Sequence, residues 1–290
     1  MKIKTLVAML FLSAGATTVV AQDATNCNSN SSISHEAVRA GNFKDAYTPW
    51  KAVLDNCPTL RFYTFTDGYK ILKGLMAQIK DKNSPEYKKY FDELMNTHDL
   101  RMKYTEEFLS KGTKVSSADE ALGIKAVDYI ALAPKVDANQ AYQWLSQSVN
   151  AVKAESAAAT IFYFLQMSLD KLKTDPNHKE QFIQDYLAAS EYADAAIAAE
   201  TNEAKKKNLQ GIKDNLVALF VNSGTADCES LQNIYGPKVE ANQTDLAYLK
   251  KVIDIMKMMK CTESEAYLQA SFYAYKMEPT AEAATGCAYQ

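Results

Sequence analysis

Glycine and proline are scarce in this chain of 290 residues, which holds only 10 glycines and 7 prolines. Together they make up about 6% of the residues, half of the roughly 12% found in an average chain. Sandwiches, barrels and propellers need frequent tight turns, so this scarcity argues against all three. Alanine, the best helix former, occurs 41 times. Because 47% of the residues are hydrophobic and 10% are aromatic, the chain can bury a core, and global disorder is excluded.

Catalytic and metal-binding motifs are missing as well. No CxxC pair occurs, which argues against zinc and thioredoxin-type sites, and no GxSxG, Walker A or dinucleotide-binding glycine pattern is present. His35, His98 and His178 are far apart and form no HExxH spacing; we expect His98 partly buried on a helix and His178 in solvent. The sequence therefore predicts no catalytic residue, metal ligand or cofactor, and a protein that is not an enzyme. Because carboxylates are plentiful, the sequence does not exclude a catalytic pair of carboxylates like that of a glycosidase.

Long apolar runs are absent too, because no stretch of eighteen apolar residues occurs and no membrane span is expected. Residues 1–21 are typical of a signal peptide. Lys2 and Lys4 precede a short apolar core at Leu6–Ser13, and Val19–Ala21 fits a cleavage site. We expect residues 22–290 to function in the periplasm, associated with the outer membrane, or secreted.

The mature chain is mildly acidic. Without the two leader lysines, 30 basic residues face 35 acidic ones, a net charge near −5. The short basic run Lys205–Lys207 lies among acidic neighbours and is predicted to be a helix face in solvent. Nucleic acid is therefore not expected as a partner.

Helical periodicity covers almost everything after residue 34, with no convincing strand, and predicts about twelve helices joined by short connections. Short connections make antiparallel neighbours the default. Helix starts are predicted where a cap residue precedes proline or lies three positions before glutamate: Ser84-Pro85, Ser117 with Glu120, Asp175-Pro176, and Thr262 with Glu265. After the first of them, one apolar stripe is formed by Tyr87, Tyr90, Phe91, Leu94 and Phe108.

The segment from Gly41 to Pro58 carries a repeat-like spacing. Counted from the glycine, aromatic, small, aromatic, β-branched and proline residues follow at +2, +5, +9, +12 and +17, namely Phe43, Ala46, Trp50, Val53 and Pro58. This resembles the second helix and exit turn of the 34-residue tetratricopeptide repeat. The small residue lets two helices approach, the aromatics fill the gaps beside it, and the proline ends the helix.

Weaker matches to the repeat pattern occur before this segment and near the end of the chain. Ile33, Ser34 and Ala37 occupy the apolar, small and packing positions of a preceding first helix. Ala274 and Pro279 repeat the interval between Val53 and Pro58, and Ala283 with Gly286 is expected to open a last, incomplete repeat near residue 280.

The chain resembles the exported tetratricopeptide-type proteins of Bacteroidota. Besides the segments above, the resemblance rests on residues 93–104, 228–237, 245–249 and 261–265. It implies an all-α protein built as a right-handed α-solenoid of antiparallel helical hairpins, with no assigned chemistry. Residues 22–290 would form one domain, with the clearest repeat at about 27–60, degenerate repeats at 61–225, and a disulfide-closed hairpin at about 227–262.

Five cysteines remain in the mature chain, and in an oxidising compartment they are read first as disulfides. Cys27 and Cys57 are 30 residues apart and Cys228 and Cys261 are 33 apart, each about one helical hairpin. We predict these two pairs, since the outer ends of an antiparallel hairpin lie side by side. Cys287 is left over, as a free thiol, an intermolecular partner, or half of a pair whose mate lies beyond Gln290.

Two functions fit these observations. The first is a non-enzymatic scaffold that binds a protein or peptide partner of the cell envelope in the groove of a repeat array. The alternative is a glycan- or small-ligand-binding protein associated with outer-membrane uptake, because exposed aromatic residues suit a sugar groove. The sequence does not indicate which residues would bind the ligand.

Overall fold

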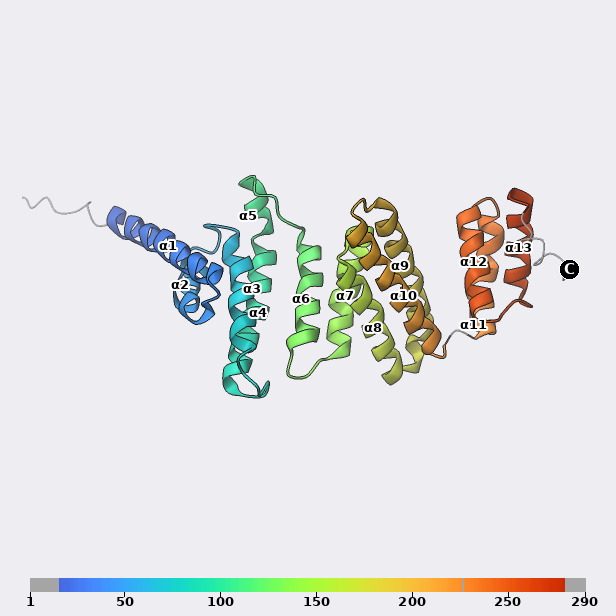
Figure 1. The fold of residues 1–290 in the computed structure, drawn as a ribbon, viewed down its shortest axis with the longest axis horizontal. Coiled ribbons are helices and arrows are strands. Elements are labelled where there is room, and N and C mark those ends of the chain that lie inside the picture. The colour runs from blue at the N-terminus through green and yellow to red at the C-terminus, as the bar shows by residue number, and fades with distance from the viewer. Residues whose placement is uncertain (1–15, 226, 280–290) are drawn as a thin grey trace, which may run out of the picture. The chain divides into compact units, whose positions relative to one another are not determined.

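A computed structural model describes residues 16–225 and 227–279, with side chains from residue 26 onward. The described elements are thirteen α-helices and three short 3₁₀ turns, with no strand among them, so the predicted all-α class is confirmed. The chain forms two compact units, Met1–Asp137 and Ala138–Gln290 (Figure 1). The predicted signal peptide lies outside the described residues up to position 15, as do Cys287 and the repeat expected from residue 280.

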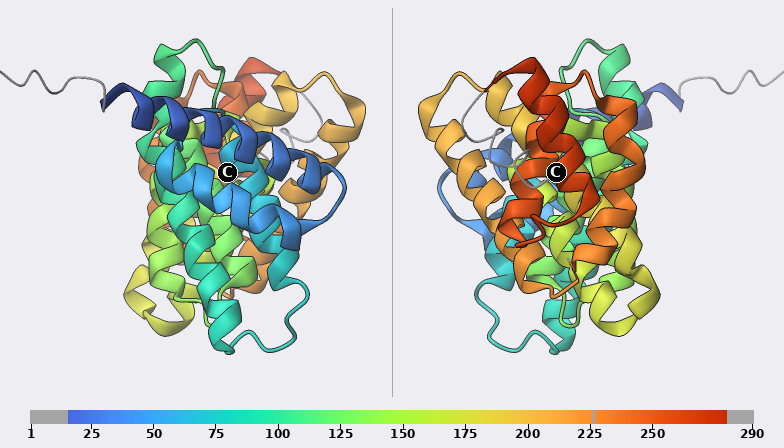
Figure 2. Two further views of the ribbon diagram at one scale, coloured as in Figure 1. Left: turned by 90° about the vertical axis from the view of Figure 1, so that its left-hand side faces the viewer. Right: turned by 90° about the vertical axis from the view of Figure 1, so that its right-hand side faces the viewer.

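Unit 1 is a run of helices in which each packs on its nearest neighbours in the chain. α1 packs on α2 and α3, α2 on α3, α3 on α4, and α4 on α6 (Figure 2, left). Contacts to the next helix and to the next but one are typical of stacked hairpins. The helices of unit 1 are α1 (Ala16–Arg39), α2 (Phe43–Asn56), α3 (Tyr63–Met76), α4 (Pro85–Lys103), α5 (Thr105–Ser110) and α6 (Ala118–Leu132).

Unit 2 repeats this mode of packing, with α8 between α7 and α9, α10 against both α8 and α9, and α13 against both α11 and α12 (Figure 2, right). Its helices are α7 (Ala138–Val152), α8 (Ala158–Thr174), α9 (Lys179–Ala199), α10 (Glu203–Asn222), α11 (Cys228–Val239), α12 (Leu246–Met258) and α13 (Glu265–Met277). Three 3₁₀ turns connect them: η1 (Lys153–Glu155), η2 (Pro176–His178) and η3 (Glu240–Asn242).

The turn between α1 and α2 has the geometry that the Gly41 position predicts. Gly41 adopts a left-handed backbone with φ of +75°, which glycine accepts without steric cost. The Asn42 N–H donates to the Ala37 carbonyl at 2.8 Å and closes the end of α1. α2 then ends at Asn56, two residues before Pro58.

The repeat-packing residues lie between α2 and α3. Ala46, Trp50 and Val53 are buried at 0–1% exposure, and Phe43 is half-buried at the start of α2. The Trp50 ring lies against Gly68 and the Phe43 ring against Gly74, both on α3. A Cβ atom at Gly68 would lie 2.6 Å from Trp50 Cζ2, and one at Gly74 would lie 2.1 Å from Phe43 Cδ2. Two glycines of α3 therefore make room for the two aromatic rings of α2.

Replacing Gly68 by alanine is expected to lower the free energy of unfolding by about 1–3 kcal/mol, since the new methyl group would overlap a Trp50 ring that is itself fully packed. Gly211→Ala in α10 is the matched control, because a Cβ atom there meets nothing within 4 Å. It should raise stability by about 0.5–1 kcal/mol through helix propensity alone. Urea unfolding followed by circular dichroism measures both; a stabilised Gly68→Ala protein would contradict the packing described.

Most of the predicted helix starts are present. The Ser84 and Ser117 hydroxyls accept hydrogen bonds from the Tyr87 and Glu120 N–H groups, and Asp175 accepts one from the Asn177 N–H. The start predicted at Thr262 is wrong by two residues. α13 begins at Glu265 and is capped by Ser264, whose hydroxyl accepts from the Tyr267 N–H.

Two predicted apolar faces are corrected by the structure. Ile33 was expected to pack but is 55% exposed, because α1 instead buries a stripe one position away that consists of Cys27, Ser31, Ser34 and Val38. Phe108 joins the same core as Tyr87, Phe91 and Leu94, but it does so from the separate short helix α5 after α4 ends at Lys103.

Each unit contains one disulfide. Cys27 of α1 is bonded to Cys57, which follows α2, with Cα atoms 6.4 Å apart. Cys228 at the start of α11 is bonded to Cys261, in the turn before α13, with Cα atoms 5.3 Å apart. These are the two pairs that the cysteine spacing predicts.

Candidate binding grooves

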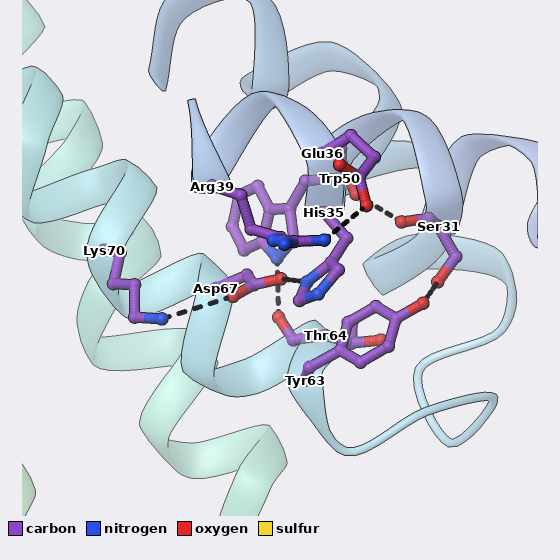
Figure 3. Close-up of polar contacts among 10 residues, drawn as sticks. Ser31, His35, Glu36, Arg39, Trp50, Tyr63, Thr64, Asp67 and Lys70 are labelled. Atoms are coloured by element: carbon purple, nitrogen blue, oxygen red, sulfur yellow. Dashed lines mark hydrogen bonds and ion pairs between the residues drawn. The ribbon is translucent and has the colours of Figure 1, made fainter. Parts of the chain in front are cut away.

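The first polar cluster of unit 1 surrounds Asp67 on α3 and holds α1 in place (Figure 3). The Asp67 carboxylate, 2% exposed, accepts a hydrogen bond from His35 Nδ1 at 2.6 Å and lies 3.6 Å from Lys70 Nζ. The His35 ring stacks on Tyr63 with centroids 4.2 Å apart, and the Ser31 hydroxyl donates to the Tyr63 hydroxyl. Because these contacts join two helices and line none of the grooves below, their role is structural.

A second cluster lies in the core between α3, α4 and α6. His98 Nε2 donates to Asp128 Oδ2 at 2.9 Å, Lys73 Nζ donates to Asp128 Oδ1 at 2.6 Å, and Tyr69 stacks on the His98 ring. Burial lowers the pKa of His98 despite the carboxylate beside it. Burial acts to raise the pKa of Asp128, but hydrogen bonds from His98 and Lys73 outweigh it and hold that pKa below its ordinary value. At neutral pH the cluster therefore contains a neutral imidazole, a carboxylate and an ammonium group.

Unit 2 contains serine, histidine and aspartate side chains in contact, but not in the order that nucleophilic catalysis needs. Ser168 Oγ donates to Asp185 Oδ2 at 2.5 Å and lies 2.9 Å from His178 Nε2. In a catalytic triad the histidine lies between the serine and the carboxylate. Here the serine lies between the other two side chains and donates to Asp185, so the order of a triad is not present. The three buried side chains join α8, η2 and α9, and His178, expected in solvent, is only 6% exposed.

The two buried histidines predict a loss of stability in acid. Burial lowers the pKa of both His98 and His178 below the ordinary value of 6.5. The unfolded chain therefore binds protons more readily than the folded one as pH falls through 6.5. The contribution of these two histidines to the free energy of unfolding should be fully present above pH 6.5 and should be lost progressively as pH falls below 6.5. Urea unfolding at a series of pH values measures this slope, and it should be shallower in His98→Gln and His178→Gln; an unchanged slope in both would contradict the assignment.

Two open grooves lie along one face of α9 in unit 2. Ile183, Tyr186, Ser190 and Asp194 follow one another at intervals of three and four residues, so they share this face. The N-terminal half of α9 and η2 form one groove with α11, of about 590 Å³. The C-terminal half of α9 forms the other with α10 and α12, of about 600 Å³. Both volumes fall in the range of ligand sites, roughly 300–1,000 Å³.

The α9–α11 groove is nearly neutral and rich in carboxamides. Its floor is apolar, formed by Ile183 of α9 and by Ile234 and Pro237 of α11. Its polar lining comprises Asn177, Lys179, Glu180, Gln184, Ser230, Asn233 and Lys238. Lys179 is paired with Asp227 at 2.6 Å, and the other two charged side chains of the lining, Glu180 and Lys238, form no ion pair with any residue that the structure describes.

The α9–α10–α12 groove is strongly charged. Asp194 is paired with Lys213 at 2.5 Å, and Lys250 with Glu278 at 2.6 Å. Lys251 lies half-buried in the groove wall and has no hydrogen-bond or ion-pair partner among the described residues. Burial lowers the pKa of Lys251, and the carboxylates of Glu191 and Asp194 act against that shift.

Two tyrosine hydroxyls near this charged groove also lack a partner. Tyr248 lines the groove, and Tyr235 is 2% exposed on α11; neither hydroxyl has a hydrogen-bond partner in the described part of the chain. An unsatisfied buried hydroxyl costs about 1–3 kcal/mol. The groove itself offers the Lys251 ammonium group and several carboxylates, while these two hydroxyls lie buried beside it.

None of these groove residues is identifiable from the sequence, because the carboxamides at positions 177, 184 and 233 come from three elements, η2, α9 and α11, the last about 50 residues after the others. The repeat-like spacing and the aromatic residues predict a groove without indicating which residues line it. The described residues contain no group of three metal-ligating side chains, and none of the described helices is long and apolar enough to cross a membrane.

Comparison with known proteins adds no relative: the chain matches no protein-family model, and no curated protein or solved structure is detectably similar to it.

Proposed function

We propose that this protein is an exported, non-enzymatic scaffold that binds a protein or peptide partner in the cell envelope. Its helical hairpins would form a right-handed, tetratricopeptide-like array. The observation that carries the proposal is the open face of α9, where two grooves of about 600 Å³ lie within a chain whose helices otherwise pack closely. A helix face left open by stacked hairpins suits an extended partner segment.

A location outside the cytoplasm is part of the proposal. Disulfides persist in oxidising compartments, and both pairs here close single hairpins. With the leader-like first 21 residues, they support export to the periplasm, to the outer-membrane surface or to the medium.

Site-specific photo-crosslinking in the producing cells tests the scaffold. A crosslinking amino acid replaces Asn233 in the groove, and a matched control replaces Lys205, which is exposed on α10. We expect one recurrent protein adduct from position 233 and none from position 205. If neither position 233 nor a position in the charged groove such as Lys250 yields a specific protein adduct, the scaffold proposal is wrong.

A glycan or small polar ligand is the second candidate, and the charged groove favours it. A sugar hydroxyl both donates and accepts hydrogen bonds, so one neutral ligand could satisfy the Lys251 ammonium and the nearby carboxylates together. Calorimetric titration with oligosaccharides from the producing cell's envelope tests this. Binding should be lost in Lys251→Met and kept in Asn233→Ala.

A further inference from the structure

The carboxamides of the α9–α11 groove are poised to bind an outside group. Asn177 and Gln184 lie on one wall and Asn233 on the other. None of these three side chains forms a hydrogen bond with the described residues, whereas many other carboxamides of the chain do, such as Gln232, which accepts from the Ala266 N–H at 2.8 Å. Each carboxamide offers one acceptor oxygen and two N–H donors, so both walls present donors and acceptors together.

The charges of the groove exclude a strongly charged occupant. Lys179 is already neutralised by Asp227, and the remaining Glu180 and Lys238 are of opposite sign. Ile183, Ile234 and Pro237 supply an apolar floor that has no group to pair with a charge placed directly on it. A neutral ligand with alternating polar and apolar parts complements this lining best.

Building on the proposed scaffold function, we propose that the α9–α11 groove binds an extended, uncharged segment of the partner through its main chain. A peptide unit has one N–H and one C=O group, which a carboxamide can engage as donor and acceptor at once. Asn177 in η2 and Gln184 in α9 lie seven residues apart along the chain, so they can engage different peptide units of one segment. Apolar side chains of the segment would contact Ile234 and Pro237 of α11.

Main-chain recognition predicts an effect of backbone methylation that side-chain recognition does not. The mature protein, with both disulfides intact, is used to select binders from a random displayed peptide library. We expect the enriched peptides to be uncharged at their centre. N-methylation of one central peptide bond should weaken binding at least tenfold, because it removes an N–H donor. Replacing the neighbouring side chain by another apolar one should change affinity less than threefold.

The protein variants complete the test. Asn177→Ala/Gln184→Ala/Asn233→Ala should lose at least tenfold in affinity for the selected peptides. The control Asn208→Ala/Gln210→Ala, which removes exposed carboxamides of α10, should bind as the unaltered protein does. Circular dichroism verifies that both variants fold, as expected for residues at the surface.

The outcomes separate this inference from the proposed function. Main-chain recognition is overturned if no peptide is enriched, if methylation has no effect, or if the triple variant binds normally. In any of these cases a protein adduct from position 233 would leave the scaffold standing with a different recognition mode. If neither position 233 nor position 250 yields a specific protein adduct, the proposed function fails as well.

Discussion

Trp50→Ala should lower the free energy of unfolding of unit 1 by about 3–5 kcal/mol, the cost typical of deleting a buried large aromatic side chain. Trp50 is 1% exposed and lies in the main core of unit 1. Its Nε1–H donates to the Thr64 carbonyl at 2.7 Å, and its ring covers Gly68, so truncation leaves a cavity and removes a buried hydrogen bond.

Trp50→Phe separates these two contributions. It keeps most of the ring but removes the N–H donor, so we expect a smaller loss of about 1–3 kcal/mol. Urea unfolding followed by circular dichroism gives both values. A loss below 1 kcal/mol for Trp50→Ala would show that α2 and α3 do not depend on this contact.

Removing the Cys27–Cys57 disulfide by Cys27→Ser/Cys57→Ser should lower the free energy of unfolding of unit 1 by about 3–4 kcal/mol. The crosslink closes a loop of 30 residues, and in the entropy model a loop of this size restricts the unfolded chain by that amount. Cys228→Ser/Cys261→Ser should have a similar effect on unit 2, where the loop spans 33 residues.

The two tryptophans allow each unit to be followed by fluorescence. Trp50 belongs to unit 1 and Trp144 to unit 2, so Trp144→Phe leaves a reporter of unit 1 alone and Trp50→Phe a reporter of unit 2. Each cysteine double variant should shift mainly the transition of its own unit. If oxidised and reduced proteins unfold at the same urea concentration, the disulfides contribute nothing to stability.

Local sequence signals predicted the parts of the fold that depend on neighbouring residues. The caps at Ser84, Ser117 and Asp175 involve groups at most three residues apart, and the turn at Gly41 needs only one residue's backbone. The cysteine pairs could be predicted because both cysteines of each pair belong to one helical hairpin. No local sequence feature marks the boundary between the two units near Asp137.

The failures have a common physical cause. From its hydropathy, Ile33 is predicted to be buried. α1 instead buries Ser31 and Ser34, whose hydroxyls donate hydrogen bonds to the Tyr63 hydroxyl and to the Ser31 carbonyl. His178 was expected in solvent because its neighbours Asp175 and Asn177 are polar, but Ser168 and Asp185 give it a buried site. Both outcomes depend on polar partners on neighbouring helices, as do the walls of the two grooves, so the periodicity of one helix could not predict them.

Both disulfides join cysteines that are consecutive in the chain, since no other cysteine lies between Cys27 and Cys57 or between Cys228 and Cys261. A chain that enters an oxidising compartment from its N-terminus would present each cysteine shortly before its native partner. An oxidase that joins cysteines in order of arrival would therefore form the native pairs directly. The protein should mature in the presence of an oxidase without needing a disulfide isomerase.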